Sequence, residues 1–212
     1  MARIIDISPI VSDRIAVWPG DVPYRREEGL SLAKGDNIGL SSIHTTVHVG
    51  AHADSPVHYV RDGRAISEAP LDHYYGACQV VQVNVPRGVR IRTSDLPVPI
   101  VAPRVLFRTG SFPDPEHFNE DFCSFSAELI EFLSGHDGLL AGIDTPSIDP
   151  FDDKGLESHQ ALARFGMSNL EGLVLSHVDP GLYTLAAFPL RIEGADASPV
   201  RAVLITGRVG PD

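Results

Sequence analysis

The sequence predicts a strand-rich α/β fold in which a few helices pack on a sheet core. Short runs rich in Val, Ile and Leu recur along the chain and are bounded by Gly, Pro, Asp or Ser, as strands are. Only two segments space their apolar residues as amphipathic helices do. The 17 prolines and 19 glycines are spread throughout, which indicates many short elements joined by turns.

The predicted elements run from one end of the chain to the other. We expect strands at residues 3–7, 14–18, 41–49, 78–85, 104–109, 139–143, 172–176, 182–188 and 201–205. We expect helices at residues 126–135 and 157–166, and a shorter one around 94–97. Ser126 suits the N-cap of the first long helix, and Gly135 and Gly166 suit the ends of the two long helices.

The organisation of the chain is simple. Its 212 residues are enough for one good hydrophobic core, and no repeat, linker or low-complexity segment divides them. We therefore expect one domain over residues 1–212. Cys78 and Cys123 form no CxxC pair, so we expect two free thiols in a reducing cytosol rather than a disulfide.

The charge of the chain excludes some partners. The formal net charge is −11, and no cluster of Lys and Arg is present, so we expect neither a nucleic-acid partner nor an anionic membrane partner. No apolar run approaches the roughly 18 residues of a membrane span. Asp6 and Pro9 interrupt the first apolar stretch too early for a secretory signal. We therefore predict a cytoplasmic protein.

The most informative segment is HVGAHADSPVH, residues 48–58, which holds three of the nine histidines. A helix would place His48 and His52 on one face, but the β-branched residues before them and the breakers Gly50 and Pro56 disfavour it. In a straight strand the two histidines would lie about 13 Å apart, too far for one metal ion. The chain must therefore bend if they share a metal, and Gly50 would allow the bend.

The ligands that this bend could bring together are imidazole nitrogens and a carboxylate. Asp54 is the carboxylate, and the mixture suits Zn²⁺ or Mn²⁺. A second ion would need ligands from elsewhere, and the downstream candidates are Glu157, His159, Glu171 and His177. For His159 and Glu171 the residues alone favour ordinary structural roles. The same holds more firmly for His44, His73, His117 and His136.

The segment HVGAHADSPVH resembles the HxGTHxDxPxH motif of the cyclase family of metal-dependent amidohydrolases. Ala51 departs from the motif, where Thr is usual, but it is not a position that would bind metal. Other segments extend the resemblance over essentially the whole chain: DISP (6–9), VWPGD (17–21), VLFRTG (105–110), GIDTPSIDP (142–150), LEGLVL (170–175) and DASPVRAVL (196–204). Within the family, WPGD together with GIDTPSIDP is similar to the bacterial kynurenine formamidases (arylformamidases).

This resemblance implies a fold of the swivelling β/β/α type, a homodimer, and a binuclear zinc site with two Zn²⁺ per subunit, Mn²⁺ being possible. The implied metal ligands are His48, His52, Asp54, His159 and Glu171. Asp54 would bridge the two ions, His58 would be the general acid/base, and Trp18 would line the substrate pocket. The implied reaction is hydrolysis of N-formyl-L-kynurenine to L-kynurenine and formate in tryptophan degradation.

Two alternatives stay open at the level of sequence. A cyclic amide or imide such as isatin could be the substrate of the same metal site. A protein of another class, a metal-binding scaffold without catalysis, could also use these ligands, although His58 would then have no evident role. The chain has no GxSxG motif, which disfavours a serine-hydrolase route.

Overall fold

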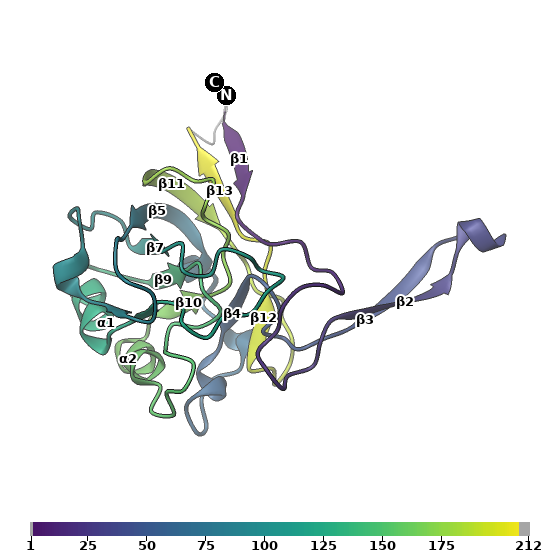
Figure 1. The fold of residues 1–212 in the computed structure, drawn as a ribbon, viewed down its shortest axis with the longest axis horizontal. Helices are drawn as coiled ribbons and strands as arrows, with labels where there is room; N and C mark the ends of the chain where they lie inside the picture. The colour runs from purple at the N-terminus through teal and green to yellow at the C-terminus, as the bar shows by residue number, and fades with distance from the viewer. Residues whose placement is uncertain (1, 208–212) are drawn as a thin grey trace.

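A seven-stranded sheet forms the centre of the computed structural model, which describes residues 2–207 (Figure 1). Its strand order is β1–β13–β11–β5–β7–β9–β10. Pairing is antiparallel from β1 to β5 and parallel from β5 to β10. The strands are β1 (Arg3–Asp6), β5 (Tyr75–Gln82), β7 (Arg104–Arg108), β9 (Leu140–Ile143), β10 (Ser168–Leu170), β11 (Gly181–Ala186) and β13 (Val203–Thr206).

The two faces of the sheet belong to separate hydrophobic cores. Val80 and Leu106 pack into one core, whereas their neighbours Val81 and Phe107 pack into the other. This alternation follows from the two-residue period of a strand, which sends successive side chains to opposite faces. Because both faces are covered, the middle residues of the central strands are apolar on both faces, as the sequence indicated.

Two α-helices cover one face. They are α1 (Ala127–Ser134) and α2 (Glu157–Phe165), which confirms both long helices expected from the sequence. Ser126 Oγ accepts a hydrogen bond from Leu129 N at 3.2 Å, the expected N-cap. Gly166 ends α2 in the left-handed region, with φ 67°. The short helix expected around 94–97 is a 3-10 turn at Thr93–Asp95.

The other face carries the small sheet of β4 (His52–Asp54) and β12 (Ala197–Pro199). Ala51 and Ala53 point from this layer into the first core, together with Val200 and Ala202. The molecule is therefore layered as small sheet, large sheet and helices, which confirms the predicted strand-rich α/β fold class. A further short pair of strands, β6 (Arg90–Ile91) and β8 (Ser124–Phe125), is parallel.

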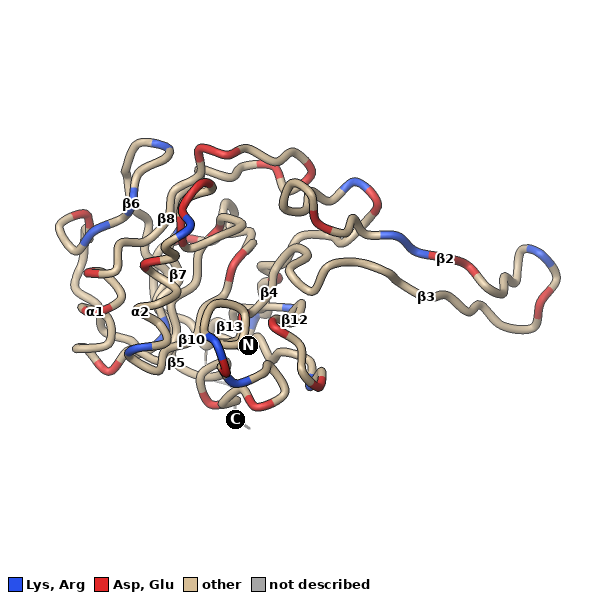
Figure 2. The backbone as a smooth tube through the Cα atoms, turned by 90° about the horizontal axis from the view of Figure 1, so that it is seen from below, with Lys and Arg blue, Asp and Glu red and all other residues tan. Residues whose placement is uncertain are grey.

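A hairpin projects from these layers as an arm, shown in Figures 1 and 2. It consists of β2 (Arg25–Leu30) and β3 (Leu40–His44), paired antiparallel. Of these strand residues, only Leu30 is partly buried and the others are exposed. The strand expected at 41–49 is therefore shorter and belongs to this arm.

Two expected strands are wrong. Residues 14–18 form a bend, where Ile15 N bonds back to Ser12 O and Ala16 N bonds to Pro115 O, so no ladder develops. Residues 172–176 also lack strand structure. Gly172 has a φ of 64°, which turns the chain out of the extended conformation directly after β10. The apolar residues at these places suggested buried strands. A strand also needs a neighbouring strand to form a ladder of backbone hydrogen bonds with, and within residues 2–207 these segments have none.

The two cysteines and the lengths of the helices can also be compared with the sequence. Cys78 and Cys123 are both free and buried, as expected. No helix among residues 2–207 is both long and apolar enough to span a bilayer.

Candidate metal centre

The segment 48–58 bends as its sequence required. The chain leaves β3 at His44 and turns, and Gly50 adopts a φ of 60°, which an L side chain rarely adopts. It then enters β4, where His52 and Asp54 point to the same side because they are two residues apart. Pro56 starts a 3-10 turn that ends at His58. The bend thus brings the polar side chains of this segment to one place.

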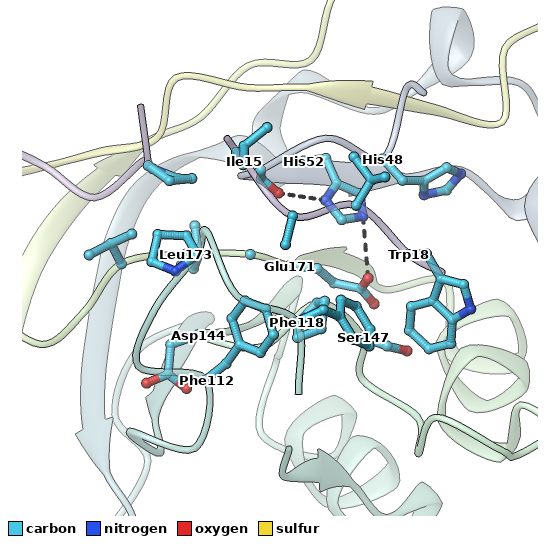
Figure 3. A pocket seen from close by; sticks show the side chains of 18 of the residues that line it. Ile15, Trp18, His48, His52, Phe112, Phe118, Asp144, Ser147, Glu171 and Leu173 are labelled. Carbon is cyan, nitrogen blue, oxygen red and sulfur yellow. Dashed lines mark hydrogen bonds and ion pairs between the residues drawn. The ribbon is translucent and has the colours of Figure 1, made fainter. Parts of the chain in front are cut away.

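His52 is held in one tautomer. Its Nδ1 lies 2.8 Å from the carbonyl oxygen of Gly50, which can only accept, so Nδ1 carries the proton. Its Nε2 therefore presents a lone pair. This nitrogen is buried without a hydrogen-bond partner, and it lies 3.3 Å from Glu171 Oε2 (Figure 3). A ligating histidine has this arrangement, with its outer nitrogen fixed by a carbonyl.

Asp54 stands between two sets of histidines. Its Oδ1 lies 3.0 Å from His48 Nδ1 and 3.5 Å from His52 Nε2, yet it makes no hydrogen bond. Its Oδ2 lies 3.2 Å from His159 Nε2 and accepts from Asn169 Nδ2 at 2.7 Å. The side chain is 1% exposed. Each oxygen therefore faces a different group of nitrogens, as a bridging carboxylate would.

Helix α2 carries His159 into the site. Asp149 caps the start of this helix and also holds the His159 imidazole in place. Leu156 has no side-chain acceptor to cap α2, and the Asp149 carboxylate accepts from Ser158 N at 3.0 Å and His159 N at 3.1 Å instead. Asp149 also lies 2.8 Å from His159 Nδ1 and pairs with Arg90 at 2.7 Å. This leaves His159 Nε2 to face Asp54 and Glu171.

Glu171 reaches the site from the end of β10. Its backbone forms two hydrogen bonds with that of His52. Glu171 N donates to His52 O at 3.0 Å, and His52 N donates to Glu171 O at 3.1 Å, so the two backbones are held side by side. Its Oε1 accepts from Ile148 N and from Asn169 Nδ2, both at 3.0 Å, and lies 3.3 Å from His159 Nε2. The backbone bridge therefore holds the Glu171 carboxylate beside the His52 imidazole.

These contacts make two groups of possible ligands that share Asp54. One is His48, His52 and Asp54, and the other is Asp54, His159 and Glu171, with the ligand atoms of each group within 4.8 Å of one another. Imidazole nitrogens with carboxylate oxygens suit Zn²⁺ or Mn²⁺. The unpartnered atoms His52 Nε2 and Asp54 Oδ1 are buried, and such atoms are costly unless something binds them. The residues therefore fit a binuclear metal centre.

The electrostatics of the cluster agree with this fit. Burial opposes ionisation, but the surrounding imidazoles hold the pKa of Asp54 well below its usual range and also lower that of Glu171. Burial likewise lowers the pKa of His48 and His159, but the carboxylates outweigh it. They raise the pKa of His48 to about 9 and that of His159 well above its usual value. The carboxylates thus attract positive charge, which a divalent ion can supply in place of protons.

A cavity of about 520 Å³ opens onto the cluster. His58 lines it, 35% exposed, with its ring centroid 4.4 Å from that of His48. Trp18 lines it too, and stacks on Phe151 with centroids 5.0 Å apart. Figure 3 shows the aromatic rings of the wall around Glu171 and His52, namely Trp18, Phe112 and Phe118.

The structure brings together the residues to which the resemblance gave a role: Trp18, His48, His52, Asp54, His58, His159 and Glu171. Glu157 and His177 are exposed and lie outside the ligand groups, so they are not ligands of this cluster. Sequence reasoning missed the roles of Asn169, Asp149 and Asp196. Asp149 is only ten residues from His159 and lies in the segment GIDTPSIDP, whereas Asn169 and the residue after Asp196 meet Asp54 from more than a hundred positions along the chain.

The comparisons with known proteins agree with this geometry. Residues 5–150, which include the whole bend, match the Cyclase family model, described as "Putative cyclase". The chain belongs to the cyclase family. His159 and Glu171 lie beyond the matched segment, and their place in the site rests on their contacts with Asp54 and His52.

Solved structures share the fold of this cyclase-family chain. A "potential metal-dependent hydrolase with cyclase activity" has a TM-score of 0.84 and 24% identity, covering 99% of this chain and 100% of the other. A predicted metal-dependent hydrolase from Bacillus stearothermophilus has a TM-score of 0.81 and 25% identity, covering 97% and 98%. Isatin hydrolase A from Labrenzia aggregata, bound to benzyl benzoate, has a TM-score of 0.78 and 21% identity, covering 96% and 93%.

Proposed function

We propose that this protein is a metal-dependent hydrolase that cleaves the C–N bond of a small aromatic amide. The observation that carries the proposal is the pair of ligand groups that share the buried Asp54, whose other four members, His48, His52, His159 and Glu171, line a cavity with aromatic residues in its wall. The family assignment and the metal-dependent hydrolases of the same fold support it.

Zn²⁺ or Mn²⁺ would be held by His48, His52 and Asp54, and by Asp54, His159 and Glu171. When bound, such an ion supplies Lewis acidity, which polarises a carbonyl and stabilises negative charge on its oxygen. The hydrolysis adds water across the amide bond and gives a carboxylate and an amine.

The remaining chemistry falls to side chains of this chain. His58 would take the proton from the attacking water and return it to the departing nitrogen. It is suited to this because it lines the cavity beside His48 and is not needed in either ligand group that shares Asp54. Trp18 and Phe118 would pack against the aromatic ring of the substrate and exclude water from it.

N-formyl-L-kynurenine is the first substrate to test. The resemblance of HVGAHADSPVH, WPGD and GIDTPSIDP to the kynurenine formamidases supports it. Its formyl group is small, and its aromatic ring suits the wall formed by Trp18 and its neighbours.

A cyclic aromatic amide such as isatin is the second candidate. Isatin hydrolase A shares the fold, and the described residues that line the cavity include no Lys or Arg. N-formyl-L-kynurenine is a zwitterion whose carboxylate finds no Lys or Arg partner in this lining, whereas isatin is uncharged. This observation favours the cyclic substrate and makes a direct comparison worthwhile.

The test is hydrolysis of both compounds by the purified protein, measured as isolated, after chelation, and after Zn²⁺ or Mn²⁺ is restored. Metal per chain is counted on the same samples. We expect turnover of at least one compound that disappears on chelation and returns with about two metals per chain, the number that two ligand groups imply. Turnover without metal would contradict the proposal. Bound metal without turnover of any amide in a wider panel would favour a non-catalytic protein.

A variant pair sharpens the test. Asp54→Ala removes the shared ligand, so we expect both metal content and activity to fall together. Glu157→Gln changes an exposed carboxylate at the start of α2 and should leave both unchanged. Full metal occupancy in Asp54→Ala would show that Asp54 does not bridge.

A further inference from the structure

Asp196 is an acidic residue beside the cluster to which the proposed mechanism gives no role. It directly precedes β12, where Ala197 pairs with Asp54 of β4. Its backbone oxygen accepts from Ser55 N at 2.8 Å. Backbone pairing thus fixes the position of Asp196 relative to the bend, independently of its side chain.

The side chain of Asp196 reaches two histidines at once. Its Oδ2 lies 2.9 Å from His48 Nε2 and 3.4 Å from His58 Nδ1. The other nitrogen of His48, Nδ1, lies 3.0 Å from Asp54 Oδ1. Each nitrogen of His48 therefore faces its own carboxylate, and one oxygen of Asp196 joins the proposed ligand to the proposed acid/base.

This geometry decides which nitrogens carry protons. His48 Nε2 is hydrogen-bonded to Asp196 Oδ2, whereas its Nδ1, although 3.0 Å from Asp54 Oδ1, makes no hydrogen bond with that oxygen. A carboxylate oxygen accepts, so Nε2 carries the proton and the Nδ1 lone pair faces Asp54. His58 Nδ1 faces the same oxygen in an ion-pair contact at 3.4 Å, which favours a proton on Nδ1 and leaves Nε2 to exchange a proton. Outer carboxylates fix the tautomers of metal-binding and catalytic histidines in this manner.

We propose that Asp196 is a positioning residue that fixes the tautomers and orientations of His48 and His58 together, so that one carboxylate prepares both the metal ligand and the acid/base. The part that concerns His58 rests on the proposed function. The part that concerns His48 rests only on the fit of the cluster to a metal.

The first experiment does not depend on activity. Imidazole ¹⁵N NMR of the zinc-loaded protein reports the tautomer of each histidine, and titration with Zn²⁺ reports the affinity. We expect His48 protonated at Nε2 and His58 at Nδ1 in the wild type. Asp196→Asn should give mixed tautomers and bind Zn²⁺ about 10–100-fold more weakly, the usual effect of losing an outer carboxylate.

The matched control is Glu193→Gln, which removes one negative charge from an exposed position near Asp196. It should keep the wild-type tautomers and bind Zn²⁺ within about twofold of the wild type. Equal behaviour of Asp196→Asn and Glu193→Gln in both measurements would overturn the proposal. So would wild-type tautomers opposite to those stated.

The second experiment uses turnover of whichever amide the wild type hydrolyses. With zinc saturating, Asp196→Asn should lower kcat by about tenfold or more with little change in KM, because His58 is misplaced rather than the substrate. Asp196→Glu, which keeps the carboxylate, should recover part of the loss. A change confined to KM would show that Asp196 does not position His58 for proton transfer.

The two experiments separate failure of this inference from failure of the proposed function. If the wild type hydrolyses no amide, the proposed function fails, while the tautomers and the zinc affinity still decide the role of Asp196. A third bound metal that is lost in Asp196→Asn would show that His48, His58 and Asp196 form a ligand group, which would also overturn a positioning role.

Discussion

His58 and Asp54 lie four residues apart on the same bend but in different surroundings. The Asp54 side chain is 1% exposed and lies in both ligand groups around it, whereas His58 is 35% exposed at the cavity wall. A buried carboxylate at the centre of a cluster suits a bridging ligand, and an accessible imidazole beside it suits proton transfer. Exposure thus separates two roles that sequence spacing alone leaves open.

His58→Ala should retain the metal and lose turnover. General acid/base residues contribute about 10²–10⁴-fold, so we expect a fall of that size in kcat. Metal content and turnover are measured on the same preparations, with exposed His117→Ala as the control. Loss of metal from the His58 variant would show that the imidazole is a ligand.

Cys78 makes stability depend on pH at the alkaline end. Burial raises the pKa of its thiol from 9.0 to about 12. In the unfolded chain the thiol ionises near its ordinary value, so its contribution to stability is complete below about pH 9 and is lost as the pH rises toward 12. One proton contributes a slope of about 1.4 kcal/mol per pH unit within this window.

Urea unfolding of the wild type and Cys78→Ala at pH 8, 9.5 and 10.5 tests this dependence. We expect the free energy of unfolding of the wild type to fall more steeply with pH than that of the variant. Parallel pH profiles would contradict the assignment, whatever the offset between them caused by the smaller side chain.

At the level of elements, the site depends on a close crossing of two segments. A Cβ on Gly172 would lie 2.1 Å from Gly50 O, and Gly172 also has a φ of 64°. Gly50 O is the atom that accepts from His52 Nδ1. The end of β10 and the bend before β4 can therefore meet only if residue 172 has no side chain.

Gly172→Ala should destabilise the protein and disturb the metal site. The backbone strain alone costs about 1–3 kcal/mol, and the clash with Gly50 adds to it. Gly166→Ala is a matched control, because Gly166 has a similar φ of 67° and no atom within 4 Å of its built Cβ. Thermal unfolding and zinc affinity are compared. Equal losses in both variants would show that the close approach does not matter.

At the level of the whole molecule, the projecting arm presents an apolar surface that is not packed against the rest of the described chain. A two-stranded hairpin is at best marginally stable alone in water. The arm exposes large apolar side chains as well: Leu32, Ile38, Leu40 and Ile43 are between 49% and 69% exposed. The homodimer implied by the sequence resemblance stays a prediction, and the arm is the surface that we expect a second copy of the chain to cover.

Paired substitution of Leu40 and Ile43 by Lys should shift a dimer toward the monomer. Sedimentation velocity over a range of protein concentrations measures this shift. Leu182→Lys, an equally exposed residue on β11, is the control. Persistence of the wild-type assembly in the arm variant would exclude the arm from the interface.

How far the sequence predicts this fold depends on how local the signals are. Helices α1 and α2 were found because apolar spacing and a following glycine, together with the Ser126 cap of α1, are contained within about ten residues. The strands β5, β7 and β9 were found because both of their faces are buried. The strand β2 was missed because RREEGL is polar and pairs in an exposed arm, and residues 172–176 were wrongly predicted because they are apolar without being paired.

For the site, the sequence by itself determined that His48, His52 and Asp54 could meet only through a bend, because the chain between them has a fixed reach and Gly50 permits a positive φ. Only the tertiary structure decided that His159 and Glu171 complete the cluster. It did so through the bridge between Glu171 and His52 and through the capping of α2 by Asp149. Asn169 and Asp196 likewise enter through strand pairing, which joins residues more than a hundred positions apart and leaves no local pattern in the sequence.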